Sequence, residues 1–168
     1  MLDKNIDKVK DKVINILRKR YKDLDIKKEN LILLHKGQFA NATVFRYCDA
    51  KIDLTIKDFS GSPWLIKNIF GRLAVNIEGK TLKKLEGNKS VTKQVKFLSP
   101  YTLSFAYIKG KPLKKCDNIP REFFITLEKN VKKMHEKEIV HLDLRNLGNI
   151  IMGENNYPYI IDFQSCIS

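Results

Sequence analysis

The sequence predicts an α+β fold built around a five-stranded antiparallel sheet. Strand-forming residues cluster at 31–35, 43–47 and 52–59 with short turns between them, which is typical of an antiparallel meander. Two further runs, at 91–98 and 101–108, complete the sheet. Helical periodicity before, within and after these strands supplies the α part of the fold.

The first and last helices are read from apolar spacing. Residues 3–24 repeat apolar side chains at helical intervals, with Lys and Arg opposite. We expect this helix to pack on the sheet that follows, although a basic amphipathic helix is also able to lie on a membrane. The last helix is predicted from Pro120 to about Lys137.

A helical stretch is also predicted between the third and fourth strands. It begins at Ser62-Pro63, because Ser is a common N-cap and Pro fits the first helical turn. It covers 63–70 and 72–86, with a kink near Gly71 and a stop at Gly87. Its apolar stripe, beside which Glu78 lies, is expected to face the core and consists of Leu73, Ile77, Leu82 and Leu85.

Composition and charge limit the class of protein. The 168 residues suit one domain or one small bilobal unit. The net charge of +13 attracts polyanions such as nucleotides, nucleic acid or an anionic membrane, but the lysines are scattered, and a solvated lysine-rich surface explains them equally well. Three distant cysteines without a Cys-x-x-Cys pair argue against a disulfide framework or zinc site and fit a reducing cytoplasm.

The start of the chain and its hydropathy bear on location. The first residues lack the apolar region of a signal peptide, and the sequence contains no run of eighteen apolar residues. We therefore expect a cytoplasmic protein that is soluble or at most peripheral at the membrane.

The most informative stretch runs from His141 to Phe163. Two short apolar strands, 149–152 and 159–163, flank a Gly/Asn/Pro-rich turn, which predicts a β-hairpin. Asp162 interrupts the second strand, and a carboxylate in a buried strand is costly unless a cation or donor meets it.

The hairpin is expected to form an oxygen-rich corner. It brings Asn149 beside Asp162, and Asp143 precedes it by a few residues. Carboxylate and amide oxygens suit Mg²⁺, which takes phosphate oxygens among its other ligands. The sequence therefore points to phosphate chemistry.

These residues carry a family resemblance. His141-x-Asp143-Leu-Arg145…Asn149 followed by Ile-Asp162-Phe resembles the catalytic loop and Asp-Phe-Gly segment of the protein-kinase-like superfamily, closest to short bacterial RIO-type and lipopolysaccharide (Kdo) kinases. The resemblance implies that Asp143 is the base facing the substrate hydroxyl and that Arg145 contacts the γ-phosphate. Asn149 and Asp162 would be the magnesium ligands.

The motif departs from the kinase pattern at two positions. The spacing from Asp143 to Asn149 is one residue longer than in the usual loop, so Asn146 is a rival ligand. Gln164 replaces the Gly of Asp-Phe-Gly. The neighbouring histidines, His135 and His141, are interpreted as structural, His141 bracing the loop.

The resemblance also implies an ATP site. In the first hairpin, Gly37 would belong to the loop over the phosphates and Val44 would cover the adenine. Lys57 stands after Ile56 in a strand, as does the phosphate-binding lysine of the kinase Val-Ala-Ile-Lys pattern. Glu78 would orient Lys57, with Glu86 as the rival.

The remaining adenine contacts come from the hinge and the hairpin. Residues 106–113 resemble the kinase hinge, where the Ala106 carbonyl and the Ile108 amide would hold adenine. Ile151 would form the floor of the adenine pocket.

The implied function is ATP- and Mg²⁺-dependent phosphoryl transfer to a hydroxyl acceptor on a protein or a sugar or lipid. The implied domains are an N-terminal helix (1–28), a kinase-like N-lobe (29–108) and a truncated C-lobe (109–168). Only six residues follow Asp162, so apolar surface of the short lobe is expected to need a partner or a second copy to cover it. A nucleotide-binding module without turnover and an RNA- or ribosome-associated RIO-like protein remain the alternatives.

Overall fold

The computed structural model describes residues 3–37 and 41–167. Its internal contacts divide the chain into two compact units, Met1–Val75 with Lys96–Tyr107 and Asn76–Val95 with Ile108–Ser168. The domain boundaries at residues 28 and 108 stay predictions.

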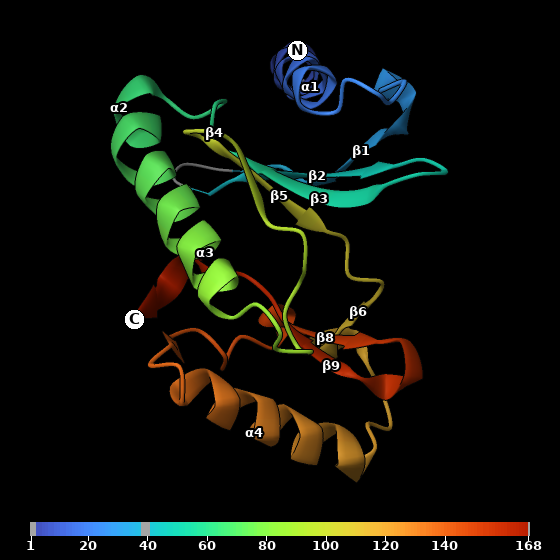
Figure 1. Cartoon of the computed structure of the whole chain (residues 1–168), viewed down its shortest axis with the longest axis vertical. Coiled ribbons are helices and arrows are strands. Elements are labelled where there is room, and N and C mark those ends of the chain that lie inside the picture. Colours follow the sequence, from blue (N-terminus) through green and yellow to red (C-terminus); the bar gives the residue numbers. More distant parts are fainter. Residues whose placement is uncertain (1–2, 38–40, 168) are drawn as a thin grey trace. The chain divides into compact units, whose positions relative to one another are not determined.

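The first unit contains the predicted five-stranded antiparallel sheet (Figure 1). Its strand order is β1-β2-β3-β5-β4, so the last two strands exchange places relative to the chain. This confirms the α+β class and the sheet. The strands are β1 (Leu31–His35), β2 (Thr43–Cys48), β3 (Asp53–Asp58), β4 (Lys96–Ser99) and β5 (Thr102–Ala106).

Helix α1 (Asp3–Arg20) packs on this sheet (Figure 1). Val13 and Leu17 of the helix are fully buried in one cluster with Phe45 and Tyr47 of β2. The cluster also includes Ile14 of the same helix. Burial of this stripe removes the apolar face from water and confirms that α1 belongs with the sheet.

The fourth strand is shorter than predicted. It begins at Lys96, because Gln94 adopts a left-handed conformation (φ 58°) that breaks the extended backbone. The residues before it belong to the second unit, where the Ser90 carbonyl accepts a hydrogen bond from the Ile160 amide at 2.8 Å. Part of the predicted strand 91–98 is therefore irregular.

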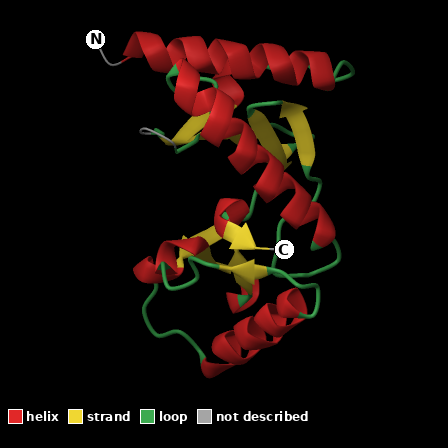
Figure 2. Ribbon diagram, turned by 90° about the vertical axis from the view of Figure 1, so that its left-hand side faces the viewer, coloured by secondary structure: helices red, strands yellow, loops and turns green. Residues whose placement is uncertain are grey.

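Helix α2 (Trp64–Ile66), a π-helical turn (Lys67–Gly71) and α3 (Arg72–Lys84) form one continuous rod (Figures 1 and 2). The π turn lies where the sequence predicted a kink. Gly71 is buried there, and a Cβ at this position would lie 2.8 Å from the Phe59 Cβ. Glycine thus allows the rod to approach the end of β3 closely.

One prediction about this rod is wrong. Leu73 was expected in the buried stripe, but its side chain is 55% exposed. The buried apolar positions of α3 are Val75 and Leu82, with Leu85 just beyond its end. The π turn adds a residue to the helical turn and shifts the register between the two halves of the rod.

The second unit combines helix α4 and the greater part of α3 with two small sheets. Helix α4 (Arg121–His135) contributes Phe123 to a core with Leu113 and Ile150. One sheet has the order β6-β8-β9 and the other pairs β7 with β10. The strands are β6 (Gly110–Pro112), β7 (Val140–His141), β8 (Ile150–Gly153), β9 (Pro158–Ile160) and β10 (Cys166–Ile167).

Short helical turns link these elements. They are η1 (Lys28–Asn30) in the first unit and η3 (Leu113–Lys115), η4 (Leu147–Asn149), η5 (Glu154–Asn156) and η6 (Phe163–Ser165) in the second. Within the described residues, none of the helices has the length and apolar character that crossing a bilayer requires.

Candidate active site

His141 links the start of the loop between β7 and β8 to the segment that follows β9. Its Nδ1 accepts a hydrogen bond from the Asp143 amide at 3.2 Å, and its Nε2 lies 3.0 Å from the Ile161 carbonyl oxygen. Because Nδ1 accepts, Nε2 carries the proton and donates to Ile161. The ring also packs edge-to-face on Phe163. The predicted bracing role of His141 is confirmed.

Asp143 and Asn149 are joined within this loop. The buried Asn149 amide nitrogen donates to the Asp143 carboxylate Oδ2 at 3.0 Å and to the Asp143 carbonyl at 3.1 Å. These two bonds fix the orientation of the amide, so that its oxygen points away from Asp143. Asn149 therefore keeps the atom that a metal ion would bind.

The rival Asn146 has a different task. Its Oδ1 accepts from the Gly148 amide at 3.0 Å, which caps the turn η4. Its nitrogen lies 3.4 Å from Asp143 Oδ2, and the side chain is exposed. Both polar atoms of Asn146 thus have partners inside the loop, which favours Asn149 as the metal ligand.

Asp162 does not lie in a strand, as the sequence had suggested. Strand β9 ends at Ile160, and Asp162 adopts the left-handed conformation (φ 66°, ψ 60°) before η6. The carboxylate is half-exposed and so avoids the cost of full burial. The Ile161 amide donates to the Asn149 carbonyl at 2.9 Å. Asp162 therefore directly follows the residue whose backbone is hydrogen-bonded to Asn149.

A non-glycine residue in this conformation is uncommon and costs about 1 kcal/mol or more. Such strain persists where the surroundings impose it, and it is frequent at functional sites. Asp162 is one of six described non-glycine residues with positive φ, and it is the one that the motif singled out.

Glu78 anchors the segment that follows Asp162. It is 2% exposed, and its Oε1 accepts a hydrogen bond from the Phe163 amide at 3.3 Å. Glu86, the alternative, is exposed. Burial, together with the smaller effect of the Glu78 and Asp162 carboxylates, raises the pKa of the nearby Cys166 thiol to about 12. That thiol stays protonated at neutral pH and is no nucleophile.

Lys57 lies in β3 of the first unit, opposite Val44 on β2 and Leu103 on β5. Only 9% of the residue is exposed, which is rare for lysine and excludes the simple interpretation of a solvent-facing strand position. Its strand neighbour Asp58 is also buried.

Asp58 was not considered in the sequence analysis. Its carboxylate accepts hydrogen bonds from the Thr102 and Ser60 hydroxyls, each at 2.7 Å, and from the Ser60 amide at 3.0 Å. An Asp two residues before a Ser at the end of a strand is the available signal, since such pairs form Asx turns.

The turn that would cover the phosphates is described only in part, since residues 38–40 lie outside the described residues. The Gly37 amide donates to the Thr43 hydroxyl at 3.3 Å, and a Cβ at Gly37 would lie 2.6 Å from the Ala42 carbonyl carbon. The close approach of the two chain segments therefore requires glycine.

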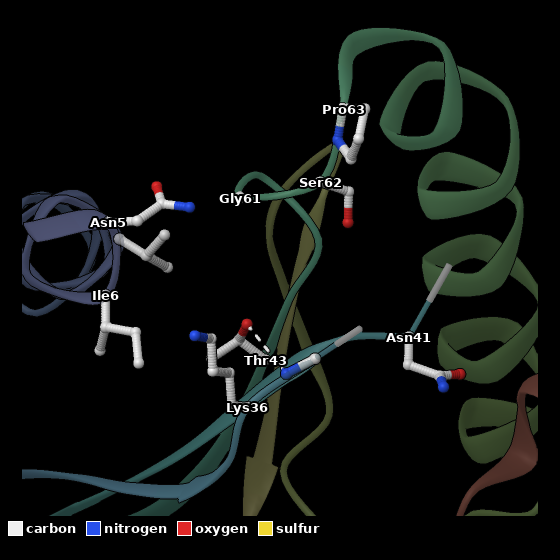
Figure 3. A pocket seen from close by; sticks show the side chains of 10 residues that line it. Asn5, Ile6, Lys36, Asn41, Thr43, Gly61, Ser62 and Pro63 are labelled. Carbon is white, nitrogen blue, oxygen red and sulfur yellow. Dashed lines mark hydrogen bonds between the residues drawn. The ribbon is translucent and has the colours of Figure 1, made fainter. Parts of the chain in front are cut away.

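A small pocket adjoins this turn (Figure 3). Lys36, Gly37 and Thr43 meet Asn5 and Ile6 of α1 there, and Gly61, Ser62 and Pro63 close the other side. Its volume of about 100 Å³ is smaller than the roughly 300–1,000 Å³ of typical ligand sites. It does not account for nucleotide binding.

The predicted adenine contacts and Arg145 are distributed over both units. Ala106 ends β5 and pairs with Leu54, and Ile108 follows in the second unit. Ile151 is buried in β8, paired with Tyr159 and Pro112. Arg145 is exposed in the loop after Asp143.

The donor set of the second unit fits magnesium. The described residues contain no group of three or more His, Cys, Asp or Glu able to hold a metal ion. Mg²⁺ needs no such cage, since it keeps several waters and takes one or two protein oxygens besides those of phosphate. The Asn149 oxygen and the Asp162 carboxylate meet that requirement.

Comparison with known proteins supports this geometry at the level of fold. No protein-family model and no curated protein sequence matches the chain. Among solved structures it is similar to the Rio2 kinase–ADP/Mg²⁺–phosphoaspartate complex from Chaetomium thermophilum, with a TM-score of 0.65 and 17% sequence identity. The similarity covers 94% of this chain and 53% of that one.

The chain has a protein-kinase-like fold. It spans about half the length of the Rio2 chain. At 17% identity the likeness establishes the kinase-like fold alone, and the finer resemblance to short bacterial RIO-type and lipopolysaccharide kinases stays a prediction.

Proposed function

We propose that the chain is an ATP-dependent phosphotransferase that moves the γ-phosphoryl group to a hydroxyl acceptor on a protein, sugar or lipid. The observation that carries the proposal is the loop of the second unit, in which Asn149 is hydrogen-bonded to Asp143 and Asp162 follows in a strained conformation. A pure hairpin would not need this polar network, because alternating apolar residues satisfy its core.

The residues of the second unit have distinct roles. Bound Mg²⁺ would offset the negative charge of the phosphates. Asn149 and Asp162 would hold it through oxygen atoms, and Asp143, kept in place by the Asn149 amide, would orient the acceptor hydroxyl and take its proton. Arg145 would contact the γ-phosphate.

The other assigned residues contribute charge and adenine contacts, and they belong to the first unit except for Glu78, Ile108 and Ile151 of the second. Lys57 would bind the phosphates, and Glu78 would hold it in place while fixing the Phe163 amide. Gly37 would lie at the phosphates, and Val44, Ala106 and Ile108 would contact the adenine, as would Ile151. Catalysis would then depend mainly on position and charge.

The similar structure bears on the acceptor. The Rio2 kinase was captured with ADP, Mg²⁺ and a phosphoaspartate. For this chain, transfer to water or to the protein itself must therefore be measured beside transfer to an added acceptor. The acceptor class is the part of the proposal that the residues leave open.

The test measures Mg²⁺-dependent ATP binding by calorimetry and follows γ-labelled phosphate. We expect Asp162→Asn and Lys57→Ala to weaken binding by roughly ten- to a hundredfold, because each removes a charge-assisted contact. The matched controls are Asp117→Asn and Lys51→Ala, which change the same groups at exposed positions and should bind like the wild type.

Transfer is judged with Asp143→Asn, which should retain ATP binding and lose phosphate transfer. Binding by the wild type without any transfer or release would instead identify a nucleotide-binding module without turnover. Equal binding in all variants would show that the assigned residues do not form the site.

A further inference from the structure

The part of the helical rod that belongs to the first unit, residues 64–75, exposes an unusual number of apolar side chains. Its exposed positions include five large apolar side chains, which we call the apolar ridge. Their exposed fractions are 72% for Trp64, 62% for Leu65, 53% for Ile69, 56% for Phe70 and 55% for Leu73. Monomeric soluble proteins seldom expose so many neighbouring apolar residues without using them.

Two polar residues of the same segment, Lys67 and Asn68, contact Tyr101 of the first unit. Asn68 donates to the Trp64 carbonyl at 2.8 Å and accepts a hydrogen bond from the Tyr101 hydroxyl, and Lys67 lies over the Tyr101 ring at 5.3 Å. Buried Gly71 sits against Phe59. These contacts fix the rotation of the rod, so the ridge cannot turn inward without breaking them.

The ridge is arranged as a surface element. Leu65, Ile69 and Leu73 recur every four residues and therefore share one side of the rod, with Trp64 and Phe70 flanking them. The stretch from residue 59 to 77 contains no Asp or Glu, while Lys67 and Arg72 lie within it. Apolar and aromatic side chains flanked by cations are typical of helices that lie in a membrane interface.

We propose that the apolar ridge docks on an anionic lipid surface. The charge decides between this occupant and a second copy of the chain, because two copies would bring together molecules that each carry +13. A lipid surface also suits a convex rod, whose protruding side chains insert between acyl chains and need no groove to receive them.

The proposal is independent of nucleotide chemistry, and the chain carries its own probe for it. Trp64 is the only tryptophan and lies at the start of the ridge. With vesicles of phosphatidylcholine and phosphatidylglycerol, its emission should shift to the blue and be quenched by brominated acyl chains. Vesicles of phosphatidylcholine alone should give a much smaller shift, because the cations then contribute nothing.

Two variants separate the apolar and the charged contributions. Leu65→Gln/Ile69→Gln should lower partition into anionic vesicles by roughly tenfold or more. Arg72→Gln, at an exposed position, should lower it by about fivefold. The matched control is Ile32→Thr/Leu34→Thr, which removes equally exposed apolar side chains from β1 and should bind like the wild type.

The outcomes that overturn the proposal are specific. Unchanged Trp64 emission with anionic vesicles would do so, as would equal loss in the ridge variant and the β1 control. An emission shift that follows protein concentration without lipid, together with a dimer in sedimentation, would assign the ridge to self-association. If the ridge variant fails to fold by circular dichroism, the Arg72→Gln variant and the brominated-lipid quenching of the wild type decide.

Discussion

At the scale of single residues, the direction of each hydrogen bond organises the loop before β8. His141 accepts at Nδ1 and donates at Nε2, so one neutral tautomer serves both contacts. The side-chain nitrogen of Asn149 donates twice to Asp143, and this nitrogen is the only donor atom of the buried amide. The conformation of the loop therefore depends on which side-chain atoms are donors and which are acceptors. A side chain of the same shape without these donors would not form the same hydrogen bonds.

Asn149→Asp tests this directly. The substitution keeps an oxygen ligand for magnesium but replaces the donor by a second carboxylate about 3 Å from that of Asp143. Loss of the two hydrogen bonds and the new repulsion should destabilise the protein by about 1–3 kcal/mol at neutral pH. The measurement is the midpoint of urea unfolding.

Asn146→Asp is the matched control. Its nitrogen is farther from Asp143, at 3.4 Å, and its exposed side chain keeps the oxygen that caps η4. We expect a change below about 1 kcal/mol there. Equal destabilisation in both variants would mean that the hydrogen bonds between Asn149 and Asp143 contribute no more to stability than the contact between Asn146 and Asp143.

At the scale of elements, the end of β3 is tied to β5 by a buried carboxylate. Asp58 is 1% exposed and accepts from Ser60 and Thr102, and Thr102 is itself hydrogen-bonded to Ser99 at 2.7 Å. Burial raises the pKa of Asp58, although the Ser60 and Thr102 hydrogen bonds and the charge of Lys12 oppose the shift. The three hydrogen bonds offset part of the cost of the charge.

The raised pKa gives stability a definite dependence on pH. A carboxyl whose folded pKa lies above its usual 3.8 stabilises the fold below that value and loses this contribution as pH rises through the folded pKa. Asp58→Asn removes the titrating carboxyl group and keeps a side chain of the same shape. Its stability relative to the wild type should therefore increase between about pH 4 and pH 7, measured by urea unfolding.

Asp49 provides a control of opposite sign. Hydrogen bonds from the Ile52 and Lys51 amides lower the pKa of its carboxyl. The wild type should therefore gain stability over Asp49→Asn as pH rises through the acidic range. A difference between wild type and Asp58→Asn that stays flat with pH would show that the Asp58 environment does not resist ionisation.

The same elements show what the sequence could predict. Alternating apolar residues and turn signals determine the sheet, α1 and the β8–β9 hairpin, because these depend on local pattern. The left-handed residues Gln94 and Asp162 were missed, because each lies inside a run that the apolar pattern predicts to be one extended strand. Leu73 was misplaced because a π turn upstream changes the helical register, and no local rule identifies that turn.

The candidate site divides in the same way. The types and order of Asp143, Asn149 and Asp162 were available from the motif, and so was the bracing role of His141. The preference for Asn149 over Asn146 rests on the hydrogen bonds of each amide, which the sequence does not show. The buried state of Lys57 and the Asp58 cluster beside it arise from pairing with β5, a long-range contact that the sequence does not show.

At the scale of the whole molecule, charge dominates. Thirty-two Lys and Arg oppose nineteen Asp and Glu, and the cations occur in both units. Such a field attracts any polyanion over distances of about a Debye length, roughly 10 Å at 0.1 M salt. The apolar ridge would determine which face of the protein contacts an anionic surface, whereas the dispersed lysines favour no particular face.

RNA binding is therefore expected to be electrostatic and without sequence preference. The affinity for a single-stranded RNA should fall by roughly a hundredfold or more between about 50 and 200 mM salt, because each neutralised phosphate releases counterions. Two oligonucleotides of unlike sequence and equal length should bind alike in fluorescence anisotropy, since specificity requires base contacts that scattered lysines do not supply. A shallow salt dependence combined with strong preference for one sequence would contradict this expectation, whereas a steep salt dependence would favour the RNA-associated alternative.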